Sequence, residues 1–459
     1  MEAAMNQSFR PSVPLARPES DVSAGVGLVG LAGLLVWLFV CRNWGSLAEM
    51  IGLPGPYTPL AGPYAALAAI LASGIPMVAW SLLVDRVHLR ASTGIDWSSP
   101  RPLHEMLPVS ITKIAGLWAT WALIAAIYCL GRWYWRGNYY FAMQLLGYAA
   151  PVLFLGAVPY VLWLDRVLVQ PRDGAWHFGA MLIGREAWDA EQVRHHLRGW
   201  AVKGFFCAFM LSIDPLGFMG EVKADYGHLA TDPVTLGNVA IEFMFMVDVQ
   251  IAMVGYLLTM KPLDAHIRTA NPLLAGWVSA LMCYPPFILM GGGNVLDYHQ
   301  NTADWAFWMA GHTKLLWLWA GVLVFLTAIY AWATVAFGLR FSNLTYRGVL
   351  TNGPYAFTRH PAYLAKNLFW WLQTLPFLAT THSPVDAVRN TVTLGLVSGV
   401  YYWRARTEEA HLLAADAKYR AYHAWMAEHG AITARFVRVG RWLARRRPVG
   451  TPAGPHPAE

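Results

Sequence analysis

The side chains with the clearest chemical potential lie in two short segments near the C-terminus. Residues 353–363 contain Gly353, Pro354, Tyr355, Arg359, His360 and Tyr363. About 45 residues after His360, the second segment contains Arg404, Glu408 and Glu409. Arginine can pair with a ligand carboxylate, carboxylates can accept hydrogen bonds from hydroxyl and amino groups, and aromatic faces attract cations. This mixture suits a ligand that carries both charges and an aromatic group.

The elements between the two segments decide whether these groups can meet. Apolar runs at 363–380 and 385–403 are separated by a short turn around Pro384, which predicts an antiparallel helical hairpin. Such a hairpin would return the second segment to the end that holds the first. Spacing alone leaves two interpretations open. The groups could form a binding site, or they could be an ordinary belt of Arg and Tyr at a membrane interface.

The composition of the 459-residue chain is that of a membrane protein. Apolar residues make up 56% and charged residues 13%, against about 25% charged in soluble domains. Runs long enough for a helix that crosses a bilayer predict an all-α, polytopic fold with about ten spans. They lie at 24–41, 62–84, 109–130, 141–164, 199–215, 237–260, 273–291, 312–338, 363–380 and 385–403.

The distribution of basic residues predicts the orientation. Lys and Arg are concentrated in the loops at 85–108, 165–198, 261–272 and 339–362, whereas 292–311 has neither. By the positive-inside rule, both termini and the C-terminal segments are expected on the cytoplasmic side. The net charge of +7 is spread over these loops, so it does not indicate a nucleic-acid partner. The four Cys lie in or beside separate apolar runs and show no metal-binding spacing.

The chain divides into four parts. We expect a disordered cytoplasmic tail at 1–22, a transmembrane bundle of unknown role at 23–310, a membrane domain with the chemical segments at 311–435, and a basic, Pro-rich tail at 436–459. Acids inside membranes are costly and often functional. Asp214, Glu242 and Asp248 fall inside or near the ends of predicted spans. They could line a polar cavity or could be satisfied by hydrogen bonds within the bundle.

The C-terminal motifs resemble one known superfamily. They read Gly-Pro-Tyr at 353–355, Arg-His-Pro-x-Tyr at 359–363, Arg-x-x-x-Glu-Glu-x-x-Leu from Arg404, and Tyr-x-x-Tyr from Tyr419. Over residues 320–430, the chain resembles the isoprenylcysteine carboxyl methyltransferase and phospholipid methyltransferase superfamily. One departure is visible: 415–419 lacks the Gly that the family usually has, so we expect the local helix to continue there.

The resemblance implies a membrane-embedded, S-adenosylmethionine-dependent methyltransferase. Its acceptor would be a lipid or another lipophilic, prenyl-like molecule that arrives from the bilayer. The resemblance also implies that the cofactor is bound by Gly353, Pro354, Tyr355, His360, Tyr363, Arg404, Glu408 and Glu409. Arg359 and Glu409 are the expected catalytic residues, with Arg359 holding an acceptor carboxylate or phosphate.

Two other functions fit parts of the sequence. An NADPH-dependent membrane sterol or enone reductase would also have about ten helices and a C-terminal Arg-His-Pro-x-Tyr, but Glu408-Glu409 followed by Leu412 fits the methyltransferases better. A transporter or a non-catalytic membrane scaffold would suit the intramembrane acids. The sequence gives no indication of the oligomeric state.

Overall fold

The computed structural model describes residues 16–184 and 186–445, and these are mostly helical. Seven helices are long and apolar enough to cross a membrane. They are α1 (Ala24–Arg42), α3 (Pro63–Leu83), α4 (Leu103–Leu130), α5 (Tyr139–Asp165), α7 (Ala190–Lys223), α8 (Pro233–Leu257) and α11 (Thr313–Phe337). The remaining helices are α2 (Trp44–Met50), α6 (Gly174–Ile183), α9 (Leu274–Leu281), α10 (Trp305–Trp308), α12 (Pro361–Thr374), α13 (Pro384–Ala415), α14 (Ala417–His429) and α15 (Thr433–Arg445). The predicted helical class is confirmed, and the seven apolar helices are compatible with an integral membrane protein.

Three of the ten predicted spans take another form. The run at 273–291 is wrong as a span, because α9 ends at Leu281 after 8 residues and the chain continues without regular structure past Pro285-Pro286. Proline lacks the N–H that a helix interior needs. The span predicted at 363–380 is also longer than the helix found there, since α12 has only 14 residues. The run at 385–403 extends into α13, a helix of 32 residues whose second half is charged.

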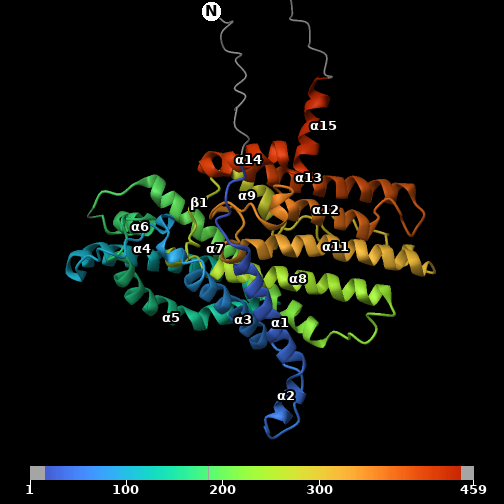
Figure 1. Cartoon of the computed structure of the whole chain (residues 1–459), viewed down its shortest axis with the longest axis horizontal. Helices are drawn as coiled ribbons and strands as arrows, with labels where there is room; N and C mark the ends of the chain where they lie inside the picture. The colour runs from blue at the N-terminus through green and yellow to red at the C-terminus, as the bar shows by residue number, and fades with distance from the viewer. Residues whose placement is uncertain (1–15, 185, 446–459) are drawn as a thin grey trace, which may run out of the picture.

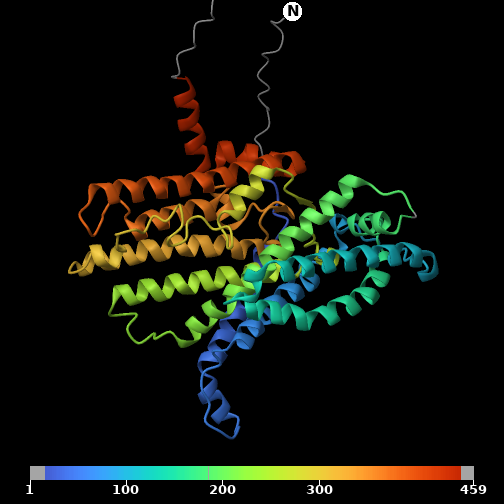
Figure 2. The same ribbon diagram turned by 180° about the vertical axis from the view of Figure 1, so that it is seen from behind.

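Two groups of helices lie on opposite sides of the molecule (Figures 1 and 2). Helices α8, α11, α12 and α13 run side by side in one half of the molecule, and α4, α5 and α6 occupy the other half (Figures 1 and 2). Within the first group, α8 and α11 are parallel, because Gly237 packs near Ala320 and the side chains of Asp248 and Tyr330 are hydrogen-bonded further along. Parallel neighbours need a connection that runs back along the group.

That return connection is the irregular segment 282–304, which lies against the α12–α13 hairpin in space. Its backbone carbonyls accept hydrogen bonds from the hairpin side chains, at 2.6 Å from Asn390 Nδ2 to Gln300 O and 2.9 Å from Arg389 Nη1 to Asp297 O. At the far end, Thr302 Oγ1 donates to Leu378 O at 2.6 Å. Non-helical backbone is tolerated at membrane depth where protein satisfies it. Part of the hydrophobic run at 273–291, including Cys283 and Tyr284, packs against the hairpin.

The N-terminal segment before α1 packs against the chain that precedes the site. Asp21 N donates to Val349 O at 2.8 Å, and Thr351 Oγ1 donates to Pro18 O at 2.9 Å. The prediction of a disordered tail is thus wrong for residues 18–22, because these hydrogen bonds satisfy their backbone groups. Residues 1–15 of that tail lie outside the described residues. At the other end, α15 covers the first part of the predicted basic tail, and 446–459 lie outside the described residues.

Two very short strands pair with each other next to the site. Strand β1 (Thr269–Ala270) pairs in antiparallel fashion with β2 (Thr345–Tyr346), with Thr269 opposite Tyr346. β1 follows α8 and β2 follows α11, so this pairing fixes the two connecting segments against each other. The start of α9 is thereby held beside the chain that leads to the 353–363 segment.

Candidate functional site

The α12–α13 hairpin brings the two chemical segments together around one carboxylate. Helix α12 begins directly after His360, whose Nε2 lies 3.0 Å from Oε1 of Glu409 on α13. Arg359 Nε lies 2.9 Å from the same oxygen, and Arg406 Nη1 donates to Oε2 at 3.2 Å. The Glu409 side chain is only 4% exposed. The sequence prediction that these residues meet at one end of a hairpin is consistent with this geometry.

The electrostatics keep Glu409 ionised. Burial raises the pKa of the Glu409 carboxyl, but the hydrogen bond with His360 and the positive charge of Arg359 outweigh it, so the pKa lies below its usual range. His423 on α14 adds a smaller effect in the same direction. Glu409 is thus a buried, charged anchor for three basic side chains.

Arg359 has unused hydrogen-bonding capacity. Its Nε is close to Glu409 but lacks the alignment of a hydrogen bond, and among the described residues neither Nε nor Nη1 has a hydrogen-bond partner although both are buried. A buried guanidinium with free donors is costly.

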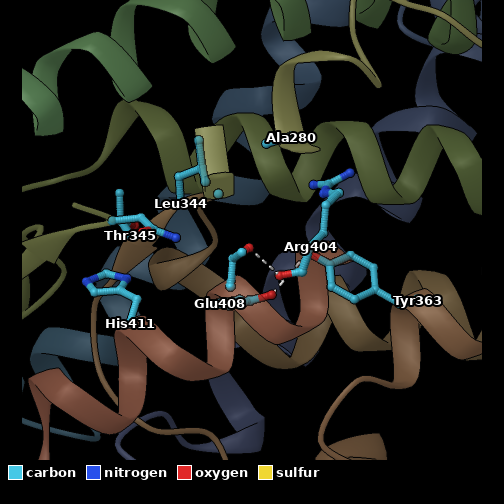
Figure 3. Close-up of a pocket in the computed structure, with 10 residues that line it drawn as sticks. Ala280, Leu344, Thr345, Tyr363, Arg404, Glu408 and His411 are labelled. Carbon is cyan, nitrogen blue, oxygen red and sulfur yellow. Dashed lines mark hydrogen bonds between the residues drawn. The ribbon is translucent and has the colours of Figure 1, made fainter. Parts of the chain in front are cut away.

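A small pocket opens on the neighbouring face of α13, where Glu408 points (Figure 3). Its cavity volume is about 20 Å³, which is room for about one water molecule and far below the volume of small-molecule sites. Glu408 lies between the Arg404–Tyr363 side and the Thr345–His411 side, and Tyr363 Oη donates to Glu408 Oε2 at 3.1 Å. The lining residues are Asn271, Gly276, Ala280, Leu344, Thr345, Tyr363, Arg404, Thr407, Glu408 and His411.

Arg404 forms one wall of the pocket and is itself enclosed by tyrosine rings. Its guanidinium carbon lies 5.1 Å from the ring centre of Tyr401, 5.3 Å from Tyr363 and 5.6 Å from Tyr284. Nη2 donates to Asn343 Oδ1 at 3.3 Å. Cation–π contacts of this kind hold a planar guanidinium in place. The aromatic faces near the pocket are thus already occupied by a cation of the protein.

Residues 353–355 pack against helices α11 and α14. Gly353 has φ +55°, and a Cβ there would lie 3.2 Å from Trp332 Nε1, so the position favours glycine. Tyr355 packs edge-on against Phe337, and its carbonyl accepts from Tyr422 Oη at 2.8 Å. In the described structure, neither these two residues nor Pro354 are among those that line the pocket. Their predicted contact with a cofactor remains a prediction.

Seven of the ten lining residues were not predicted from the sequence, among them His411, Thr345 and Asn271. His411 lies one turn after Glu408 on the same helix face, a spacing that could have indicated it, and its Nε2 is 2.9 Å from Thr269 Oγ1. Thr345 and Asn271 reach the pocket only through the β1–β2 pairing, for which no motif exists. Among the described residues, the buried Oγ1 of Thr345 has no hydrogen-bond partner.

The helix that carries the glutamates ends where the departure from the family motif was noted. Helix α13 stops at Ala415, and Asp416 caps α14 by accepting from the backbone N–H of Lys418. The expectation that the helix continues through 415–419 is therefore wrong, because an aspartate at an N-cap starts a new helix without any glycine. The turn folds α14 back so that Tyr419 and Tyr422 pack near the 346–349 segment.

Comparison with known proteins gives no relative: no family model, no curated protein and no solved structure matches the chain.

Proposed function

We propose that the C-terminal part of the chain is a membrane-embedded methyltransferase that uses S-adenosylmethionine and a lipid or lipophilic acceptor. The observation that carries this proposal is the convergence at one end of the α12–α13 hairpin. There, the His360–Glu409 hydrogen bond lies on one face of α13, and the Glu408-lined pocket lies on the next. The motif resemblance assigned both glutamates to one cofactor site.

The polar groups around Glu408 suit the cofactor chemically. Its carboxylate can accept hydrogen bonds from ribose hydroxyls or an amino group, and the unpartnered Oγ1 of Thr345 adds a further polar contact. The free donors of Arg359 suit a carboxylate. When bound, the cofactor supplies a methyl group on a sulfonium, whose transfer to an acceptor electron pair breaks the carbon–sulfur bond and leaves a neutral thioether.

The residues of this chain then have positional tasks. Glu409 orients His360 and Arg359, and the Tyr363–Glu408 hydrogen bond orients the pocket carboxylate. An in-line displacement depends mainly on alignment of the two reactants, which can supply about 7–11 kcal/mol of the barrier. An acceptor carboxylate would need no base, and Arg359 is placed to hold it.

The surface of the hairpin supports a lipophilic acceptor. Leu368 on α12 and Val392 and Leu396 on α13 are large apolar side chains that remain exposed. Exposed apolar residues on a membrane protein contact lipid. A molecule dissolved in the bilayer could therefore approach the pocket along the hairpin.

A methyl-transfer assay tests the proposal. The detergent-purified protein is incubated with S-adenosylmethionine labelled in its methyl group and a total membrane lipid extract, and label is counted in the organic phase. We expect transfer by the wild type, loss in Glu408→Gln and Glu409→Gln, and full activity in Glu428→Gln, an exposed acid on α14. Equal counts in the wild type and both site variants contradict the proposal. Oxidation of NADPH with an enone substrate would instead identify a reductase.

A further inference from the structure

The α7–α8 interface holds two buried polar side chains without partners. Asp214 on α7 is 2% exposed and Gln250 on α8 is fully buried. Among the described residues, neither oxygen of the Asp214 carboxyl and neither polar atom of the Gln250 amide has a hydrogen-bond partner. The other two acids predicted near these spans differ. Glu242 is exposed, and Asp248 accepts a hydrogen bond from Tyr330 at 2.7 Å.

The packing of the two helices places Asp214 and Gln250 at the same level. The rings of Phe206 and Tyr256 stack with their centres 5.4 Å apart, and a Cβ on Gly217 would lie 3.9 Å from that of Met246. These contacts make α7 and α8 antiparallel neighbours. Asp214 lies one turn before Gly217, and Gln250 lies one turn after Met246. Both are therefore on the contacting faces.

The surroundings of the pair are apolar. Met210, one turn before Asp214, and Ile251, next to Gln250, belong to a large buried hydrophobic cluster that also includes Leu34 of α1 and Ala69 of α3. An ionised carboxylate without partners is very unfavourable in such a place. A neutral carboxylic acid is tolerated only if its O–H and its carbonyl oxygen are hydrogen-bonded.

We propose that Asp214 and Gln250 form an internal proton-binding site in the membrane bundle, separate from the C-terminal site. The four unpartnered atoms are those of an acid–amide pair. With a proton on Asp214 and the two side chains turned toward each other, the acid O–H donates to Gln250 Oε1, and Gln250 Nε2 donates to the other carboxyl oxygen. A proton is thus the ligand that satisfies both side chains at once.

Glu221 extends the site toward one end of the bundle. It follows Asp214 by two helical turns on the same face of α7 and is 1% exposed. Its Oε2 accepts from Tyr226 at 3.1 Å, and within the described residues its Oε1 has no partner. Arg42 anchors this end by donating to Ala224 O at 2.8 Å.

The packed helices carry several other titratable groups. Helix α3 contributes only Tyr64, near its start, and Asp248 of α8 is engaged by α11. The remaining groups are Cys41 and Arg42 of α1, Tyr139, Tyr140, Tyr148, Tyr160 and Asp165 of α5, Glu191, Arg194, His195, His196, Arg198, Lys203, Cys207, Glu221 and Lys223 of α7 itself, and Glu242 and Tyr256 of α8.

A hydrophobic carbodiimide tests the site in the full-length, detergent-purified protein. Only a protonated carboxyl adds to dicyclohexylcarbodiimide: its proton moves to a carbodiimide nitrogen as its oxygen bonds the central carbon, and rearrangement leaves a stable acylurea. Mapping by mass spectrometry should find Asp214 labelled, with less label as pH rises. Label should persist in Glu242→Gln, and Asp214→Asn should show none on the corresponding peptide. If sodium chloride protects Asp214 at constant pH and choline chloride does not, the site binds sodium and the proton assignment is wrong.

Thermal melting provides a second readout that does not depend on access of the reagent. Asp214→Asn should melt close to the wild type, because an amide can also pair with Gln250. Asp214→Leu and Gln250→Leu should each melt several degrees lower, and the double variant should recover part of the loss. Strictly additive losses would mean that the two side chains do not pair and would overturn the proposal.

Discussion

His360 and Glu409, which are 49 residues apart in the chain, are joined by a hydrogen bond of 3.0 Å. The α12–α13 hairpin makes this contact possible, because it returns α13 to the point where α12 begins. Glu409 also lies against Arg359. Glu409 of the second motif therefore contacts both Arg359 and His360 of the first motif. These contacts are the structural basis of the proposed cofactor site.

The Glu409 cluster should make stability depend on pH in one direction. Because the folded-state pKa of Glu409 is lowered, its stabilising effect is present above the ordinary glutamate pKa of about 4.3. The effect is lost as pH falls through the lowered value. Glu409→Gln should therefore cost on the order of 3–5 kcal/mol at neutral pH. Its melting midpoint should approach that of the wild type below about pH 4. An equal gap at both pH values would contradict this account, and Glu428→Gln should show no gap.

Tyr363→Phe should weaken cofactor binding without unfolding the protein. The variant removes the hydrogen bond from Tyr363 Oη to Glu408, and hydrogen bonds to charged groups contribute about 1.5–3 kcal/mol. We expect at least about a tenfold loss of affinity for S-adenosylhomocysteine. Tyr402→Phe is the matched control, since this tyrosine is 68% exposed. Unchanged affinity in Tyr363→Phe would show that the hydrogen bond does not orient the pocket carboxylate.

Arg404→Lys should be damaging although it keeps the charge. The three tyrosine rings around Arg404 suit a planar guanidinium, whereas an ammonium is compact and strongly hydrated. We expect a loss on the order of 1–2 kcal/mol in the free energy of unfolding, together with weaker ligand binding. Arg406→Lys should change stability much less, because the Arg406 side chain is 60% exposed. Equal effects of the two variants in thermal melts would contradict the role given to the tyrosines.

The N-terminal segment should stabilise the region that carries the site. The Asp21 carboxylate accepts from Val349 N at 2.7 Å and from Lys418 Nζ at 2.6 Å. Asp21→Ala leaves both donors unpaired and should cost about 1–3 kcal/mol. The exposed Glu19, changed to Ala, is the control. If limited proteolysis near Lys418 proceeds at the same rate in both variants, the N-terminal segment does not stabilise this region.

Long apolar runs were well predicted from the sequence, and the irregular membrane segment was not. Helices such as α1 and α11 coincide with their predicted runs within a few residues, because length and hydropathy alone specify them. The run at 273–291 has the same composition but contains Pro285-Pro286, and only some of its apolar side chains, such as Cys283, pack in the cluster with α13. Composition alone does not distinguish a span from a buried return segment.

The site was predictable to the extent that helix geometry determines it. The hairpin explains why His360 meets Glu409, but the motif did not indicate that the adjacent Glu408 points into a different space. Successive residues on a helix are about 100° apart, so the two glutamates cannot serve the same contact. Thr345 and Asn271 were missed because their position depends on a strand pairing between segments that are distant in the chain.

Calorimetric binding of S-adenosylhomocysteine to the detergent-purified protein tests the proposed function most directly, with NADPH titrated separately and Glu409→Ala as the paired variant. We predict micromolar binding of S-adenosylhomocysteine by the wild type, on the order of −8 kcal/mol, no binding by Glu409→Ala, and no binding of NADPH. Since Glu409→Ala could disturb folding, its helical content and melting behaviour are measured alongside. Binding of NADPH alone, or of neither nucleotide, would contradict the assignment of a methyltransferase site.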